Sequence, residues 1–329
     1  MLAAAGAAAL VALTRARHAR RVEARLASRL PLGTDGVVRG SGPIALGGPG
    51  RAPGGADGPG PAALVVHGFG DTPQSVAELC AHLHAAGWTV RAPLLPGHGR
   101  TARAFAAARS GEWLDAARDA YRALRHRPGA PAGGAPVALV GQSMGAALAA
   151  VLAAEAARAG ERVPALVLLA PYLAAPASVR WGARLAPLLA LAVEYLSSDG
   201  GPRSIHDAEA RAAALGYGVV TPHLVRELAR VVDLARRALP HVDAPTLAVL
   251  SRLDHRVAPA DGAAAFARVG AGVEARGGGP VVKELVWLEA SGHVVAADRE
   301  RARVFALAEA WLARDRAPGG ARQPAGAGA

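Results

Sequence analysis

The sequence contains little cysteine, few aromatic residues and almost no lysine. Cys80 is the only cysteine, so no disulfide can form within the chain and the fold needs no oxidising compartment. Aromatic residues make up 4% of the 329 residues, whereas a binder of single-stranded nucleic acid stacks bases on aromatic side chains. Lys283 is the only lysine, so arginine carries nearly all of the positive charge.

The net charge of +11 allows nucleic acid or anionic lipid as partners. The arginines, however, are scattered along segments of helical spacing and form no single basic run. Alanine, glycine and proline are also abundant, which indicates a compositional bias of the whole chain. We therefore expect no nucleic-acid partner.

The N-terminal segment is apolar and is followed by a group of arginines. Residues 1–13 are rich in alanine, and Arg15, Arg17, Arg20 and Arg21 come directly after them. A spanning helix needs about 20 apolar residues, and a secretory signal carries its positive charges before the apolar run. We therefore expect a helical segment over residues 1–35 in a soluble, cytoplasmic protein, with weak membrane association through residues 1–21 as the alternative.

Short apolar runs alternate with segments of helical spacing along the middle of the chain. Such runs are typical of strands that are buried on both faces. Residues 75–86 and 145–157 have helical length and spacing. The alternation predicts an α/β fold with a mostly parallel central sheet flanked by helices. The expected strands cover residues 62–66, 88–92, 137–140, 165–169, 246–250 and 284–288.

Residues 172–240 interrupt this alternation. No strand is expected there, whereas Leu224, Leu228 and Val231 share one helical face. We predict a helical cap insertion of about 172–240 within a hydrolytic domain that covers residues 36–316. The Gly- and Ala-rich residues 317–329 are expected to form a disordered tail.

The most informative motif is Gly141-Gln142-Ser143-Met144-Gly145. It follows an expected strand and precedes an expected helix, which is the context of a nucleophile elbow. A sharp turn there pushes the Ser143 hydroxyl above the sheet, and Gly141 and Gly145 allow the strand and the helix to approach closely. The helix N-terminus favours developing negative charge. Ser143 is therefore the predicted nucleophile, supported by Gly141, Gln142 and Gly145.

A second motif, His67-Gly68-Phe69-Gly70, follows the expected strand at residues 62–66. Its turn would direct backbone N–H groups at the reaction centre. The N–H groups of Phe69 and Met144 would then form an oxyanion hole. We expect His67 and Gly68 to support this turn, with His67 a structural residue and not the catalytic base.

The remaining two catalytic residues are predicted from their places after later strands. Asp254 follows the expected strand at 246–250, and His293 follows the strand at 284–288, which gives the chain order Ser, Asp, His. Asp243 precedes its strand and Asp233 lies in the expected cap, so both are weaker candidates for the carboxylate. His98 follows an earlier strand, and its place in the order argues against it as the base.

These motifs resemble the α/β-hydrolase superfamily, in particular its bacterial carboxylesterase and monoacylglycerol lipase branch. The segment Leu95-Pro96-Gly97-His98-Gly99 is part of the resemblance, which covers residues 62–312. It implies a helical cap over an acyl pocket, no metal and no cofactor. It also implies cleavage of small acyl esters, short- to medium-chain or monoacylglycerols, through an acyl-enzyme, with a Ser143–Asp254–His293 triad and an oxyanion hole of Phe69 and Met144.

Other activities on this fold remain open at the level of the sequence. Thioesterases and amidases use the same triad, and an aminopeptidase would need an acidic group for the substrate amine, which Glu194 or Glu227 could supply. A dehalogenase would need a carboxylate where Ser143 stands. A non-catalytic binding protein on this fold typically lacks a triad residue. The sequence does not determine the acyl chain length, the alcohol or the oligomeric state.

Overall fold

The computed structural model describes residues 2–47, 60–198 and 204–314. Its centre is a seven-stranded sheet with the order β1-β3-β2-β4-β5-β8-β9. All neighbouring strands are parallel except β1 and β3, which pair antiparallel at one edge. The strands are β1 Ile44–Leu46, β2 Ala62–Val66, β3 Thr89–Ala92, β4 Val137–Gln142, β5 Leu166–Leu169, β8 Thr246–Ser251 and β9 Lys283–Leu288.

The mostly parallel sheet flanked by helices confirms the fold predicted from the sequence. All six expected strands are present, each within two residues of the expected bounds. The four central strands β2, β4, β5 and β8 are buried along their whole length, which explains their continuous apolar runs. Strand β1 was not predicted, because three partly exposed edge residues leave no periodic pattern.

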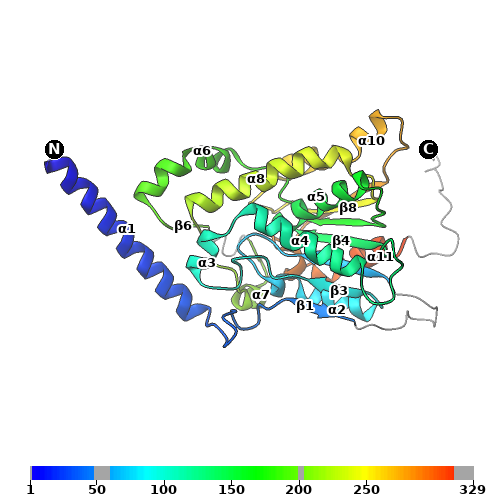
Figure 1. Ribbon diagram of the computed structural model, residues 1–329, viewed down its shortest axis with the longest axis horizontal. Coiled ribbons are helices and arrows are strands. Elements are labelled where there is room, and N and C mark those ends of the chain that lie inside the picture. Colours follow the sequence, from blue (N-terminus) through cyan, green and yellow to red (C-terminus); the bar gives the residue numbers. More distant parts are fainter. Residues whose placement is uncertain (1, 48–59, 199–203, 315–329) are drawn as a thin grey trace.

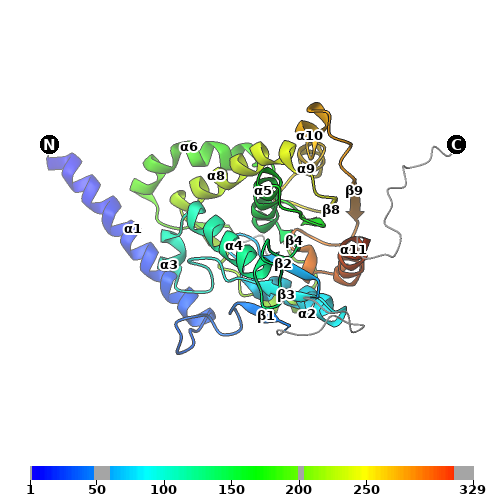
Figure 2. The same ribbon diagram turned by 45° about the vertical axis from the view of Figure 1, so that its right-hand side comes forward.

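Helices cover both faces of the sheet (Figures 1 and 2). Neighbouring residues of one strand enter different cores, as Leu64 and Val65 of β2 do. The Leu64 core includes α4 Ser110–Arg125, α5 Met144–Arg158 and α8 Pro222–Ala238. The Val65 core includes α2 Ala77–Ala85, with the buried Cys80, and α11 Arg301–Ala313.

The cap insertion was predicted in the region between β5 and β8. This region contains α6 Ala177–Ala192, α7 Ala208–Ala213 and α8, whose Leu224, Leu228 and Val231 are buried as expected. The expectation that it holds no strand was wrong. Strands β6 Leu196–Ser197 and β7 Val219–Val220 form a small antiparallel pair. Two residues per strand are too few to produce a recognisable period in the sequence.

Helix α1 Leu2–Arg29 precedes the sheet and contacts α6. Val22 and Leu26 near its C-terminal end, and Leu30 directly after it, are buried, whereas the N-terminal half extends away from the body (Figure 1). In the described ranges, no helix is long and apolar enough to cross a membrane. The predicted tail, residues 317–329, lies outside the described residues, and the predicted domain bounds and cytoplasmic location stay predictions.

The remaining helices connect these layers. Helix α3 Ala102–Ala107 lies beside α1 and α8, and α9 Pro259–Phe266 and α10 Ala271–Ala275 follow β8. Because β4, β8 and β9 are parallel, their C-terminal ends meet at the same edge of the sheet. The loops that carry the predicted catalytic residues all leave from this edge.

Candidate active site

Ser143 lies between the last residue of β4 and the first residue of α5, in a strained backbone conformation. Its φ and ψ are 55° and −118°, a region that residues with a side chain rarely adopt. Two backbone hydrogen bonds hold it there: Ser143 N–H donates to the Leu169 carbonyl at 2.9 Å, and Tyr172 N–H donates to the Ser143 carbonyl at 3.1 Å. The hydroxyl is thereby fixed above the sheet.

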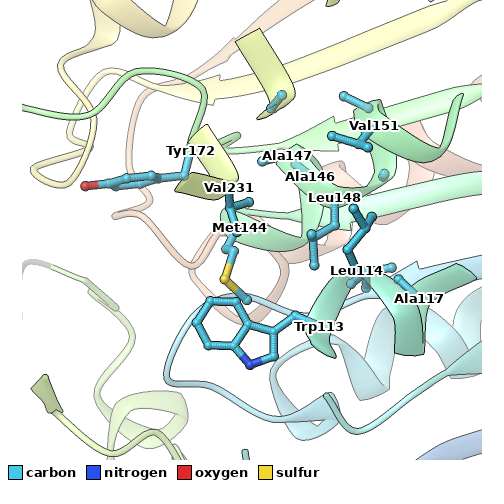
Figure 3. Packing of buried hydrophobic residues seen from close by; sticks show 14 of the residues in the cluster. Trp113, Leu114, Ala117, Met144, Ala146, Ala147, Leu148, Val151, Tyr172 and Val231 are labelled. Atoms are coloured by element: carbon cyan, nitrogen blue, oxygen red, sulfur yellow. The ribbon is translucent and has the colours of Figure 1, made fainter. Parts of the chain in front are cut away.

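The two elbow glycines are needed for close backbone approach. A Cβ atom at Gly141 would lie 2.3 Å from the Gly145 carbonyl oxygen, and one at Gly145 would lie 2.1 Å from the Val66 carbonyl oxygen. Below the elbow, Met144 points its fully buried side chain towards Trp113 in the core (Figure 3). Strand β2, strand β4 and helix α5 therefore meet without space for any larger residue.

Three predicted catalytic side chains form one hydrogen-bonded chain. His293 Nε2 lies 2.7 Å from Ser143 Oγ, and His293 Nδ1 lies 2.7 Å from Asp254 Oδ2. All three residues are buried, with exposed fractions of 8% for Ser143, 6% for His293 and 8% for Asp254. The rival carboxylates Asp233 and Asp243 are exposed. The structure thus brings together the three residues that the sequence singled out.

The environment of Asp254 favours its charged form. Its Oδ1 accepts hydrogen bonds from the backbone N–H groups of Arg256 at 2.7 Å and Val257 at 3.1 Å. Burial works towards a higher pKa, but the charge of His293, its hydrogen bond and these two N–H groups outweigh burial, so the pKa of Asp254 is lowered. An anionic Asp254 keeps the proton of His293 on Nδ1 and leaves Nε2 as an acceptor.

The turn after β2 lies against Ser143. A Cβ atom at Gly68 would lie 3.2 Å from the Cβ of Ser143. In the described part of the chain, the N–H groups of Phe69 and Met144 have no hydrogen-bond acceptor. The turn is held on both sides at Gly70, whose N–H donates to His98 Nε2 at 3.1 Å and whose carbonyl accepts from Tyr217 N–H at 2.9 Å.

His67 and His98 are buried and neutral supports of this turn. His67 Nε2 accepts from Leu95 N–H at 3.2 Å, so its Nδ1–H donates to the Gly68 carbonyl at 2.9 Å. His98 has the same arrangement, with Nδ1–H donating to the Pro96 carbonyl at 3.1 Å. Burial lowers the pKa of His67 to about 4 and holds the pKa of His98 well below its usual value. The expected structural role of His67 agrees with these contacts, and His98 shares it.

Gln142 connects the elbow to the loop that carries the histidine. Its side-chain oxygen accepts a hydrogen bond from Ala296 N–H at 3.0 Å, in the short helix η4 Val295–Ala297 that directly follows His293. The side chain of Gln142 is 1% exposed. A residue expected to support the elbow therefore also fixes the distance between Ser143 and His293.

Asp298 is a supporting residue that sequence reasoning missed. Its buried carboxylate accepts from the backbone N–H groups of Gly292 at 2.6 Å, His206 at 2.9 Å and Asp207 at 2.8 Å. It thus joins the His293 loop to the cap. The sequence holds no signal for this role, because Asp298 stands among charged residues at the start of α11 and resembles any solvated helix start.

A pocket of about 340 Å³ opens beside Ser143 and His293. The cap covers it with apolar side chains of Val179, Val220 and Leu228. The pocket also contains Asp71, which the sequence analysis did not single out. Burial raises the pKa of Asp71 to about 6, although the charges of Arg256 and His293 oppose this shift.

The two glutamates considered as amine ligands do not line this pocket. Glu194 forms an ion pair with Arg15 of α1. The buried carboxylate of Glu227 accepts from Ser110 N–H at 3.1 Å and from Ser110 Oγ at 2.7 Å, and it also pairs with Arg230. Both carboxylates are therefore occupied in stabilising the cap and α1.

The parallel sheet, the strained serine elbow and the order of the three loops define an α/β-hydrolase. A family model described as serine aminopeptidase, S33, matches residues 59–276, so the chain belongs to this hydrolase family. The matched region includes the elbow and the Asp254 loop and ends before His293.

The chain is similar to several lipolytic enzymes. A thermostable monoacylglycerol lipase from Bacillus sp. (strain H-257) is 26% identical over 248 residues, which cover 74% of this chain and 86% of the relative. A structure of the metagenome-derived lipolytic enzymes LipS and LipT matches with a TM-score of 0.69 and 27% identity over 84% of this chain and 98% of that chain. The Paleococcus ferrophilus monoacylglycerol lipase shares the fold, with a TM-score of 0.64 and 17% identity over 83% of this chain and 98% of its own. The predicted resemblance to the carboxylesterase and monoacylglycerol lipase branch is confirmed.

Proposed function

We propose that this hydrolase cleaves carboxylic esters, short- to medium-chain acyl esters or monoacylglycerols, through a covalent acyl-enzyme on Ser143. The observation that carries the proposal is the unbroken hydrogen-bonded chain from Ser143 Oγ through His293 to Asp254, with both links at 2.7 Å. This arrangement is the activated nucleophile of serine hydrolases.

In the first half-reaction, Ser143 Oγ attacks the ester carbonyl carbon while His293 Nε2 takes the hydroxyl proton. The anionic Asp254 accepts the hydrogen bond from Nδ1–H, holds the ring in place and stabilises the imidazolium as it forms. The negative charge on the former carbonyl oxygen is stabilised by the N–H groups of Phe69 and Met144 and by the N-terminus of α5. Loss of one such donor typically costs about 3 kcal/mol of transition-state stabilisation.

The two remaining steps use the same groups. His293 gives its proton to the leaving alcohol, and the carbon–oxygen bond of the ester breaks, which leaves the acyl group on Ser143. A water molecule then attacks the acyl carbon while His293 takes its proton. Collapse of this second intermediate returns the proton to Ser143 and releases the carboxylic acid.

The charges in the pocket favour a neutral ester over an amine substrate. Among the residues that the structure describes, Arg29, Arg211 and Arg256 line the pocket, and Asp71 is the one carboxylate in that lining. The excess of positive charge disfavours the ammonium group that an aminopeptidase binds. The kinship with a monoacylglycerol lipase and with lipolytic enzymes also supports an ester substrate.

Steady-state kinetics test the proposal directly. We expect the wild-type chain to hydrolyse p-nitrophenyl esters, with highest kcat/KM for short to medium acyl chains, and to turn over amino-acid anilides poorly. Ser143→Ala should lower ester turnover by a factor of about 10⁴ or more while the fold is retained, as judged by circular dichroism. Near-wild-type ester turnover in Ser143→Ala, or a preference for anilides, contradicts the proposal.

A further inference from the structure

Helix α6 carries its large apolar side chains on the side that faces solvent. Trp181, Leu185, Leu188 and Leu191 are 59%, 45%, 66% and 69% exposed, whereas the small Ala186 on the opposite side is 3% exposed. A surface helix ordinarily buries its apolar face, and contiguous exposed apolar side chains indicate an interaction site. We call these four residues the outer face of α6.

Positive charge accompanies the outer face. Helix α6 contains no acidic residue, and its Arg180 and Arg184 are exposed. The guanidinium of Arg184 lies 5.1 Å from the centre of the Trp181 ring. Exposed tryptophan and leucine combined with arginine are typical of helices that lie in the interface of a bilayer with anionic headgroups.

Helix α1 is fixed beside the C-terminal end of α6. Arg15 forms an ion pair with Glu194, and His18 Nε2 lies 3.2 Å from the Tyr195 carbonyl oxygen. Both views show the N-terminal half of α1 extending at the same end of the molecule as α6 (Figures 1 and 2). The two helices thus form adjacent parts of one end of the molecule.

The extending part of α1 repeats the composition of the outer face. Leu10 and Leu13 are 63% and 54% exposed, and exposed Arg17, Arg20 and Arg21 follow them on the helix. Apolar and cationic side chains, with no acidic residue before Glu23, therefore continue from α6 onto α1.

From these observations we propose that the outer face of α6, together with residues 10–21 of α1, docks onto the surface of an anionic lipid bilayer. The leucines and Trp181 enter the interface, and the arginines contact anionic headgroups. Val179, also on α6, lines the catalytic pocket. Docking therefore places the pocket beside the apolar phase, into which acyl esters partition. The contact is peripheral and does not depend on the proposed chemistry.

Charge complementarity favours a lipid surface over a second copy of the chain. Two outer faces brought together would place Arg180 and Arg184 of both copies near each other, without an acidic residue on α6 to pair with them. An anionic surface offers the opposite charge to Arg180 and Arg184 of α6 and to the exposed arginines at positions 17, 20 and 21 of α1.

Vesicle binding tests the proposal with the inactive Ser143→Ala protein, so that the result is independent of ester hydrolysis. The chain is sedimented with vesicles of phosphatidylcholine alone and of phosphatidylcholine with about 30 mol% phosphatidylglycerol. We expect binding to the anionic vesicles, several-fold weaker binding without phosphatidylglycerol, and a decrease as salt is raised. Equal binding to both vesicle types, or none to either, overturns the proposal.

Tryptophan fluorescence reports the contact itself. Trp181 is exposed, Trp287 on β9 is partly buried beneath Arg252, and Trp88, Trp113 and Trp311 are at most 4% exposed, so the part of a blue shift that Trp181→Phe removes reports Trp181. Trp181→Phe should lose most of this shift and still sediment with vesicles. A full shift in Trp181→Phe shows that another part of the chain meets the lipid and overturns the proposal.

Matched variants locate the surface. Leu188→Ser with Leu191→Ser should reduce the vesicle-bound fraction by about tenfold or more. Val282→Ser is the control, because Val282 is similarly exposed, at 52%, but lies outside the cap and α1. Unchanged binding in the double variant contradicts the proposal. The proposal is also contradicted if, without vesicles, the wild type sediments as a dimer and the double variant as a monomer, because the outer face then binds a second copy.

Discussion

At the scale of single residues, Ser143 keeps a backbone conformation that its own Cβ disfavours. The hydrogen bonds to Leu169 and from Tyr172 hold it there, and the surrounding core keeps the turn sharp. Such strain persists at sites where the position of one functional atom matters more than local stability. The nucleophile should therefore lower the stability of the fold that carries it.

This strain is measurable by comparing two inactive variants. Ser143→Gly and Ser143→Ala both remove the hydroxyl, but only alanine retains the Cβ that the φ of 55° disfavours. We expect the glycine variant to have the higher free energy of unfolding, by about 1 kcal/mol, in urea denaturation. An alanine variant that is as stable as the glycine variant shows that the elbow is unstrained.

Asp71 should make the stability of the protein depend on pH in a characteristic direction. Its pKa is raised from 3.8 to about 6, so between these values the native state binds more protons than the unfolded state. The contribution of Asp71 to the free energy of unfolding therefore falls as pH rises through this window, by about 2 to 3 kcal/mol in total. Asp71→Asn should be more stable than wild type at pH 7 and lose this advantage near pH 4.

Urea denaturation of both proteins at several pH values checks this expectation. Asp115→Asn, on the exposed side of α4, is a matched control that should give no such difference. A stability difference between Asp71→Asn and wild type that is constant with pH contradicts a raised pKa.

Sequence reasoning identified residues whose motif depends on local backbone geometry, and it missed those that act through distant contacts. Ser143, Asp254 and His293 each follow a strand, so their order and places were visible. Asp71 and Asp298 gain their roles only from folding. Asp71 lies in the pocket that the cap covers. Asp298 accepts a hydrogen bond from the backbone N–H of His206, which is 92 residues away in the sequence. No local pattern distinguishes such carboxylates from solvated ones.

At the scale of elements, the loop after β9 is held at two points. Gln142 bonds to Ala296 on one side of His293, and Asp298 bonds to Gly292 on the other. These contacts fix the histidine relative to β4 and to the cap. The distance of 2.7 Å between His293 Nε2 and Ser143 Oγ thus depends on residues outside the predicted triad.

Asp298→Ala should loosen this loop and the cap together. The change leaves the backbone N–H groups of Gly292, His206 and Asp207 without their acceptor, which should lower the free energy of unfolding by about 3 kcal/mol. We also expect kcat for a p-nitrophenyl ester to fall at least about tenfold, because His293 loses its fixed position. Thermal unfolding and steady-state kinetics measure both effects.

Asp233→Ala is the control for this variant, because Asp233 is exposed on α8. It should change neither the unfolding temperature nor kcat. If Asp298→Ala behaves like the control, Asp298 does not position the His293 loop.

The strands were predictable to the extent that they are buried on both faces. Strands β2, β4, β5 and β8 lie inside the sheet and have continuous apolar sequences, so their existence and parallel pairing followed from the sequence. The edge strand β1 and the β6–β7 pair are short and partly exposed, and tertiary contacts alone define them.

At the scale of the whole molecule, two neutral histidines inside the fold should make it sensitive to acid. Burial lowers the pKa of His67 from 6.5 to about 4 and holds the pKa of His98 well below its usual value. A lowered pKa means that the unfolded state binds more protons below pH 6.5. Stability that is fully present above this pH is therefore lost as pH falls towards 4, by about 3 kcal/mol for His67 alone.

Guanidinium denaturation between pH 7.5 and 4.5 measures this loss. Asp71 acts in the opposite direction over part of the same range, so the Asp71→Asn background shows the effect of the histidines undiminished. In that background His67→Asn should flatten the pH dependence, whereas His126→Gln, at an exposed residue that follows α4, should not. An unchanged slope in His67→Asn shows that His67 is not the neutral, buried group inferred from its contacts.

The sequence predicted that a cap is present but not how its helices are arranged. The insertion was visible as a break in the strand and helix alternation, and the apolar face of α8 was visible in its spacing. The outward apolar face of α6 was not predicted, because spacing identifies an apolar side of a helix but not which way that side faces. That direction is set by the packing of α6 against α8.

The most direct test of the catalytic assignment is the mass of the protein after reaction with a fluorophosphonate. A neutral Ser143 hydroxyl activated by His293 should take up one adduct per chain, on the peptide that contains Ser143. We expect no adduct in Ser143→Ala and much slower labelling in His293→Ala. An adduct on another residue, formed equally fast in Ser143→Ala, contradicts the account.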